Sequence, residues 1–177
     1  MAQPDKLPLD SALHDYYSNG DYQDSYSASL EGRTDLQQCD IRLLAEQLGN
    51  IDIGWAIFLL KLRNLVVKPF SLKSTDDLQN NRVNLVPTNK GVGDRVAFFK
   101  IYAICENEII LGEDDWHQDF RVSLYRTRDH APRVIMTTIC KRHNAFGHAY
   151  LAAILPFHKL IVRSTLDAGT TKPLLSV

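Results

Sequence analysis

The chain has 177 residues, a formal net charge of -1 and 45% hydrophobic residues. This length fits one domain with a sizeable core. The near-neutral charge gives no electrostatic reason to expect nucleic acid or an anionic membrane as a partner. The three cysteines are widely spaced and odd in number, and the N-terminus lacks the basic and apolar regions of a signal peptide. We therefore expect reduced thiols and a cytoplasmic protein.

The N-terminal part of the chain predicts one strand followed by two helices. Residues 1–20 are expected to form a mostly loop-like extension. Residues 21–30 alternate between two sets of side chains, which is typical of a strand, and one of its faces is expected to be polar. Apolar residues at helical spacing then predict helices at about 35–48 and 52–67, and Pro69 ends the second one.

From residue 82 onward the pattern changes to short extended segments separated by turns. We expect these strands at residues 82–86, 96–105, 108–112, 117–126 and 133–142. Hairpin-like spacing favours an antiparallel meander. Because strands and helices are segregated along the chain, the fold class is α+β.

A long apolar helix is predicted at residues 144–166, with Asn144 as its N-cap. Pro156 lacks an amide hydrogen and is expected to bend the helix. A bent helix suits a curved sheet and leaves room for a cavity. We expect a single domain over residues 21–166, followed by a tail over 167–177.

A membrane span is the alternative for this helix, but its uninterrupted apolar run covers only residues 149–157. Lys159 and Arg163 follow within the length that a bilayer requires. We therefore predict that the helix packs on the sheet of its own chain.

Three stretches carry a family resemblance. The first is Gly54-Trp55 with Lys61-Leu62-Arg63-Asn64. The second is Leu111-Gly112-Glu113-Asp114-Asp115 running into Asp119-Phe120-Arg121-Val122-Ser123. The third is His143-Asn144 with Tyr150-Leu151 and Leu155-Pro156-Phe157-His158. They resemble the bacterial family known as domain of unknown function 2867 (DUF2867), and the order of elements is similar to the START-like (SRPBCC) helix-grip superfamily.

The resemblance implies a curved antiparallel sheet that grips the C-terminal helix, with two short helices after the first strand. It implies no established reaction, substrate or catalytic residue. Some relatives join this domain to a nucleotide-dependent oxidoreductase domain, so the resemblance also implies an oxidoreductase as a partner. This chain has no glycine-rich nucleotide-binding fingerprint.

The densest group of titratable residues surrounds the strand predicted at residues 117–126. If residues 117–125 are extended, His117, Asp119 and Arg121 point to one side. One interpretation is an acid/base pair of His117 and Asp119, with Arg121 orienting a carboxylate or oxyanion. The other is a solvated sheet face whose charges pair with neighbouring strands. The alternation favours the second interpretation.

A second set of residues is suited to lining an apolar cavity, because ligand sites are mostly apolar with few polar groups. This set is Tyr102, Trp116, Phe120, Met136, Tyr150, Phe157 and His158. Each of them alone is also a plausible core residue. His143 and His158 flank an intact helix and lie about 20 Å apart, too far to share a metal ion, so neither a metal nor another cofactor is predicted.

The leading hypothesis is a protein that binds a small apolar or aromatic molecule between the sheet and the C-terminal helix. One alternative is an enzyme of the cyclase, dehydratase or isomerase type that uses His117, Asp119 and Arg121. Another is an accessory domain of an oxidoreductase, which rests on the family resemblance alone. The sequence does not decide whether the chain is an enzyme, and it does not fix the oligomeric state.

Overall fold

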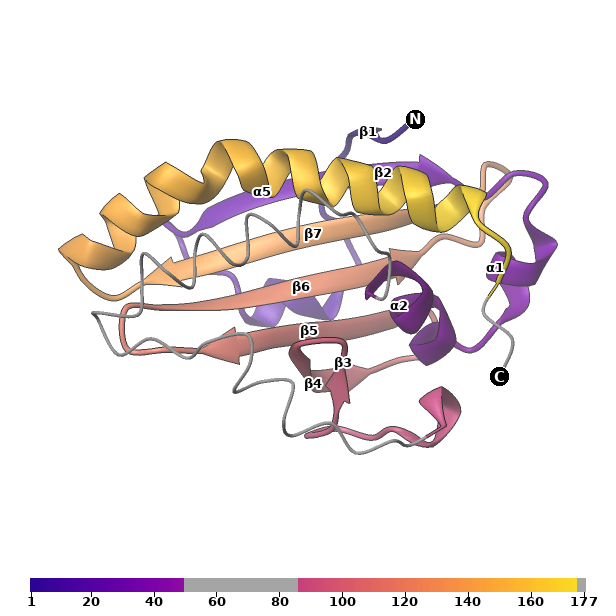
Figure 1. The fold of residues 1–177 in the computed structure, drawn as a ribbon, viewed down its shortest axis with the longest axis horizontal. Coiled ribbons are helices and arrows are strands. Elements are labelled where there is room, and N and C mark those ends of the chain that lie inside the picture. The colour runs from indigo at the N-terminus through magenta and orange to yellow at the C-terminus, as the bar shows by residue number, and fades with distance from the viewer. Residues whose placement is uncertain (50–85, 175–177) are drawn as a thin grey trace.

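A computed structural model of the chain describes residues 1–49 and 86–174. A seven-stranded antiparallel sheet forms one layer, and helices α2 (Ile41–Gly49) and α5 (Ala145–Thr171) pack on the same face of it (Figure 1). We call this side the helix face and the opposite side the outer face. The predicted α+β class and helix-grip arrangement are confirmed.

The strands follow the order β1-β2-β7-β6-β5-β4-β3 across the sheet. Their bounds are β1 (Gln3–Pro4), β2 (Tyr22–Ser29), β3 (Arg95–Val96), β4 (Phe99–Ile104), β5 (Glu108–Asp114), β6 (Gln118–Arg126) and β7 (Arg133–Arg142). Strands β3 to β7 form the predicted meander, and β2 pairs with β7 at its far side. The first and last long strands are therefore neighbours.

Helix α5 begins where the sequence predicts, because the Asn144 side chain accepts a hydrogen bond from the amide of Gly147 at 2.9 Å. It continues through Pro156 and ends at Thr171, five residues beyond the predicted end at Leu166. Leu151, Val162 and Leu166 are its buried apolar residues. They face the sheet, where α5 contacts β2 and β7.

By length and composition, α5 is the one helix in the described part of the chain that could cross a membrane. A core helix passes the same test, so the test alone is weak evidence. The packing of α5 on β2, β7 and α2 is the arrangement expected of a helix that belongs to the domain.

The first predicted helix, at 35–48, is present but is divided into α1 (Thr34–Gln38) and α2. The division falls at Cys39 and Asp40, where Cys39 has extended backbone angles. The second predicted helix, at 52–67, and the strand predicted at 82–86 lie outside the described residues, apart from Val86, which is not in a strand.

The N-terminal extension is more ordered than the predicted loop. Strand β1 pairs with β2, and the short 3-10 helix η1 (Ala12–Asp15) covers the outer face. Leu13 of η1 packs against Ile110 and Ile139. The side chains of Ile110 and Ile139 point to the outer face, whereas their neighbours along each strand point to the helix face. The sheet is therefore covered on both faces.

Two predicted strands differ from the structure. The strand predicted at 96–105 is divided into β3 and β4 by a turn in which Ala97 has a φ of 50°. The strand predicted to start at His117 starts at Gln118 because the chain bends at Trp116 and His117. This bend changes the direction of the His117 side chain.

Candidate functional site

The helix face of the sheet has an apolar half and a polar half. The apolar half, toward the C-terminal end of α5, contains Tyr26, Leu111, Leu124, Val134, Met136 and Leu166. The polar half, toward the N-terminal end of α5, contains Tyr22, Asp24, Gln118, Thr138, Cys140 and His158. Buried polar groups are normally retained only where they have hydrogen-bond partners or a function. We therefore take the polar half as the candidate site.

Tyr22, Asp24 and His158 form a hydrogen-bonded chain across the interface between β2 and α5. The Tyr22 hydroxyl donates to Oδ2 of Asp24 at 2.7 Å, and Oδ1 of Asp24 lies 3.2 Å from Nε2 of His158. The side chains of Asp24 and His158 are only 13% and 21% exposed. Burial, together with the hydrogen bond to Asp24, raises the pKa of Tyr22 far above its usual value. The tyrosine therefore remains a donor.

Thr138 lies directly opposite Asp24 on β7 and points to the same face. The residue is 6% exposed, and its hydroxyl oxygen has no hydrogen-bond partner in residues 1–49 and 86–174. An unsatisfied buried hydroxyl costs about 1–3 kcal/mol. Within the described residues, the candidate site thus contains a buried hydroxyl without a hydrogen-bond partner.

Cys140 is next to this group and donates its thiol hydrogen to Oε1 of Gln118 at 3.4 Å. Burial raises the pKa of the Cys140 thiol to about 12. The thiol is therefore protonated at neutral pH, which favours a packing role for Cys140 over a nucleophilic one.

The turn between β5 and β6 packs on the first turn of α5. The His117 ring is 2% exposed and lies 5.5 Å from the Phe146 ring and 5.0 Å from the Tyr150 ring. Trp116 stacks on Phe146 at 5.3 Å. A Cβ on Gly147 would lie only 2.1 Å from the His117 carbonyl oxygen, so this close approach requires glycine.

Arg121 belongs to a separate cluster on the outer face. Its guanidinium bonds to Oδ1 of Asp114 at 2.7 Å and lies 3.4 Å above the Tyr102 ring and 4.8 Å from the Tyr16 ring. These stacked contacts attach the N-terminal extension to the sheet. Asp119, on the same face, lies 3.0 Å from Nε2 of His143.

The structure therefore does not bring the three predicted catalytic residues together. Asp119 and Arg121 share the outer face, as predicted, whereas the His117 ring contacts the residues at the start of α5. Asp119 is paired to His143 and not to His117. Their catalytic roles stay predictions.

The predicted cavity residues are also divided between locations. Phe120, Met136 and His158 lie on the helix face, and Tyr150 contacts His117. Tyr102 is on the outer face, and Trp116 and Phe157 are 51% and 48% exposed. Only part of this set can line one site.

Sequence reasoning missed Tyr22, Asp24 and Thr138. A signal for Asp24 was present, because the alternation in β2 places this acid on the same side as Tyr22 and Tyr26. An acidic residue among aromatic side chains on an inward face is unusual without a partner. The partner, His158, is 134 residues away in sequence and could not be identified from the strand alone.

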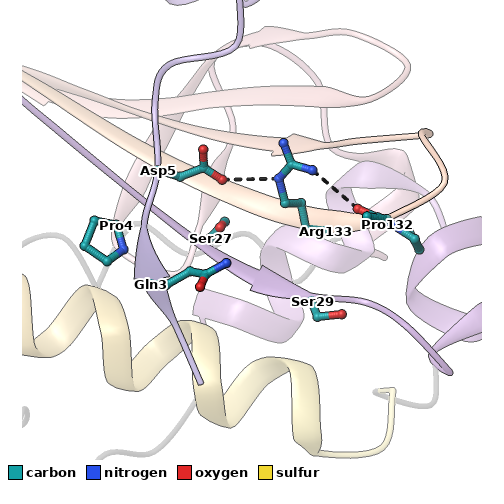
Figure 2. A pocket seen from close by; sticks show the side chains of 8 residues that line it. Gln3, Pro4, Asp5, Ser27, Ser29, Pro132 and Arg133 are labelled. Carbon is teal, nitrogen blue, oxygen red and sulfur yellow. Dashed lines mark hydrogen bonds and ion pairs between the residues drawn. The ribbon is translucent and has the colours of Figure 1, made fainter.

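Two pockets border the N-terminal half of the chain, and no α5 residue lines either of them. The first, about 430 Å³, lies between β1, β2 and the loop before β7, where Arg133 reaches toward Asp5 at 3.2 Å (Figure 2). The second, about 410 Å³, lies beside the start of β2, and Asp24 is among its lining residues. Its other lining residues on β2, Gln23 and Ser25, point to the outer face, so this pocket lies on the side of the sheet opposite α5.

A family model for proteins of unknown function, DUF2867, matches residues 17–165. The chain belongs to the DUF2867 family. This match covers most of the chain and includes β2, the meander and most of α5, so the elements that build the candidate site lie inside the matched region.

Membership in DUF2867 assigns no reaction or ligand to the site. Searches of curated proteins and of solved structures find no match. Within the described residues of this DUF2867 chain, no group of three or more His, Cys, Asp or Glu side chains is placed to hold a metal ion. The fold is compatible with membership in the START-like superfamily, and that membership stays a prediction.

Proposed function

We propose that the chain binds a small apolar or aromatic molecule between the sheet and the N-terminal half of α5. The observation that carries the proposal is the composition of the polar half of the helix face. Phe120 and Leu151 supply apolar surface there, Asp24 supplies a hydrogen-bond acceptor, and Thr138 supplies a hydroxyl that has no partner among the described residues. A mostly apolar site with few polar groups is typical of small-molecule recognition.

The contrast between the two halves of the helix face supports the same proposal. An interface that only stabilised the fold would gain more from apolar residues, because buried polar groups cost free energy unless they are fully bonded. The apolar half follows this rule through residues such as Leu124 and Leu166. The polar half departs from it at Thr138.

A proton-transfer enzyme is the second candidate, and the pair of Asp24 and His158 favours it. A carboxyl group beside a histidine is a recurrent acid/base arrangement. This assigns the enzymatic alternative to residues other than His117, Asp119 and Arg121.

Three free cysteines, Cys39, Cys105 and Cys140, support the inference that the chain works in the reducing cytoplasm.

Native mass spectrometry of gently purified protein tests the binding proposal. A mass excess over the denatured chain that disappears on denaturation is the expected result. A bulky substitution at the site, His158→Trp, should remove the excess. The matched variant His148→Trp changes an exposed position on the same helix and should retain it. An excess equally present in both variants, or absent from the wild type, contradicts the proposal.

A further inference from the structure

His158 is held in one orientation by its partners on β2. Oδ1 of Asp24 lies 3.2 Å from its Nε2 atom, and the Tyr22 ring meets the imidazole edge-on at 6.3 Å. A carboxylate that accepts from one ring nitrogen fixes the tautomer in which the other nitrogen carries a lone pair. Nδ1 of His158 has no hydrogen bond to any described residue. It is therefore set up to accept a proton.

The hydroxyl of Thr138 supplies a second element of the same site. Thr138 and Asp24 are opposite residues on paired strands, so their side chains are neighbours on the helix face. A hydroxyl with no partner in the described parts of the chain can donate to a ligand oxygen. Asp24 thus links the two groups that enolisation of a carbonyl compound needs, a base at His158 and a hydrogen-bond donor at Thr138.

We infer that Asp24 and His158 form a general acid–base pair that moves a proton within a bound neutral carbonyl compound with an apolar or aromatic body. The inference rests on the proposed binding function and names the ligand class for the same site. His158 is the proton-transfer residue, and Asp24 is a positioning residue that acts through it. Thr138 donates to the carbonyl oxygen.

The step is balanced without an oxidant or a reductant. Nδ1 of His158 takes a proton from a carbon next to the ligand carbonyl, and the electrons of that C–H bond form a carbon–carbon double bond. The carbonyl π electrons move to oxygen, which accepts the Thr138 hydrogen bond. When the ligand carries a β,γ double bond, the product of this step is a dienolate, and the protonated His158 returns its proton to the γ-carbon. The carbonyl re-forms, which gives the α,β-unsaturated isomer of the ligand and the original imidazole.

The aromatic compound 5-nitrobenzisoxazole is a suitable probe for such a base. Removal of its one isoxazole C–H proton forms a nitrile, breaks the N–O bond and releases a coloured phenolate. The wild-type chain should accelerate this reaction about a hundredfold over an equal concentration of free imidazole. His158→Ala should lose the acceleration, and added imidazole should restore part of it.

His148→Ala is the matched control, because His148 is an exposed histidine on the same helix. It should react at the wild-type rate. Asp24→Asn should lower kcat with KM little changed, because an amide can present either its oxygen or its NH2 group to Nε2 and so no longer fixes the imidazole tautomer. Tyr22 and the neighbouring Cys140 face His158 from β2 and β7, and both remain protonated at neutral pH.

The outcomes separate this inference from the binding proposal. Saturable binding of the probe without acceleration overturns the acid–base pair and leaves the binding function standing. Neither binding nor acceleration counts against both. Acceleration that survives in His158→Ala, with melting temperatures unchanged, overturns the role of His158.

Discussion

Asp24 and Thr138 lie directly opposite each other on β2 and β7, yet the carboxyl group of Asp24 has two partners while the Thr138 hydroxyl has none among the described residues. A valine at position 138 keeps the shape of the side chain and removes the unsatisfied group. We expect Thr138→Val to raise the free energy of unfolding by about 1 kcal/mol, as measured by urea denaturation, and to weaken ligand binding.

The neighbouring residue provides the matched control. Thr137 points to the outer face and shares a buried hydrogen bond of 2.9 Å with Ser25. Thr137→Val leaves the Ser25 hydroxyl unpaired, so it should lower the free energy of unfolding by about 1 kcal/mol. Equal effects of the two substitutions would show that the Thr138 hydroxyl is satisfied.

Gly112 is required by a close approach between β5 and β6. A Cβ at this position would lie 2.2 Å from the Phe120 carbonyl oxygen and 2.9 Å from Cδ of Arg121. Because backbone cannot move aside cheaply, Gly112→Ala should cost about 3 kcal/mol of stability in thermal denaturation. Gly91→Ala should melt close to the wild type, because among the described residues the nearest atom to a Cβ at this position is Oδ2 of Asp94 at 3.9 Å.

Glu108 attaches the N-terminal extension to the outer face. Its buried carboxyl group accepts hydrogen bonds from the Ser11 and Ser123 hydroxyls at 2.5 Å and from the Ala12 amide at 2.8 Å. Glu108→Ala leaves these donors unpaired and should lower stability by about 3 kcal/mol. Limited proteolysis should then cleave near η1. The exposed Glu106 serves as control, since Glu106→Ala should leave the cleavage pattern unchanged.

Asp114 should make stability sensitive to acid. Burial tends to raise the pKa of Asp114, but hydrogen bonds from Arg121 and Tyr102 outweigh it and hold the pKa below its ordinary value of 3.8. A lowered folded-state pKa gives stability that is present above pH 3.8 and lost as the pH falls through the folded value. The stability difference between the wild type and Asp114→Asn should therefore shrink in acid. A difference that stays constant down to pH 2 would contradict this linkage.

The three thiols should react in order of exposure. Cys105 is exposed, whereas burial raises the pKa of Cys39 and raises that of Cys140 to about 12. Iodoacetamide at mildly alkaline pH should add one group rapidly, and peptide mapping should locate it at Cys105. Cys105→Ser should abolish the rapid phase. Early labelling of Cys140 would show that the polar half of the helix face is open to solvent.

The sequence predicted those elements whose pattern is strong and local. Strand β7 has the predicted bounds, and α5 has the predicted cap at Asn144, because alternation and capping depend on neighbouring residues. His117 was placed on the wrong side because a bend interrupts the alternation before Gln118. That bend is stabilised by the bond from the His143 amide to the His117 carbonyl, a contact that no local pattern contains.

The candidate site was harder to predict than the fold for the same reason. Asp24, Thr138 and His158 come from three different elements, and only the pairing of β2 with β7 and the packing of α5 make them neighbours. The role of η1 depends on Glu108, which is far from it in sequence. Composition and periodicity indicate which residues face inward, but they do not indicate which inward residues meet.

The pairing of β2 with β7 also affects how the chain reaches its native state. Ser25 and Thr137, partners in this ladder, are 112 residues apart in sequence. Strand pairing between segments far apart in sequence forms slowly, because the entropy of closing the intervening chain is lost before the stabilising contacts form. During synthesis, β2 leaves the ribosome long before its partner is made. Ser25, Ser27 and Ser29 give β2 a hydrophilic side. This side disfavours self-association of β2 before its partner strand β7 is available.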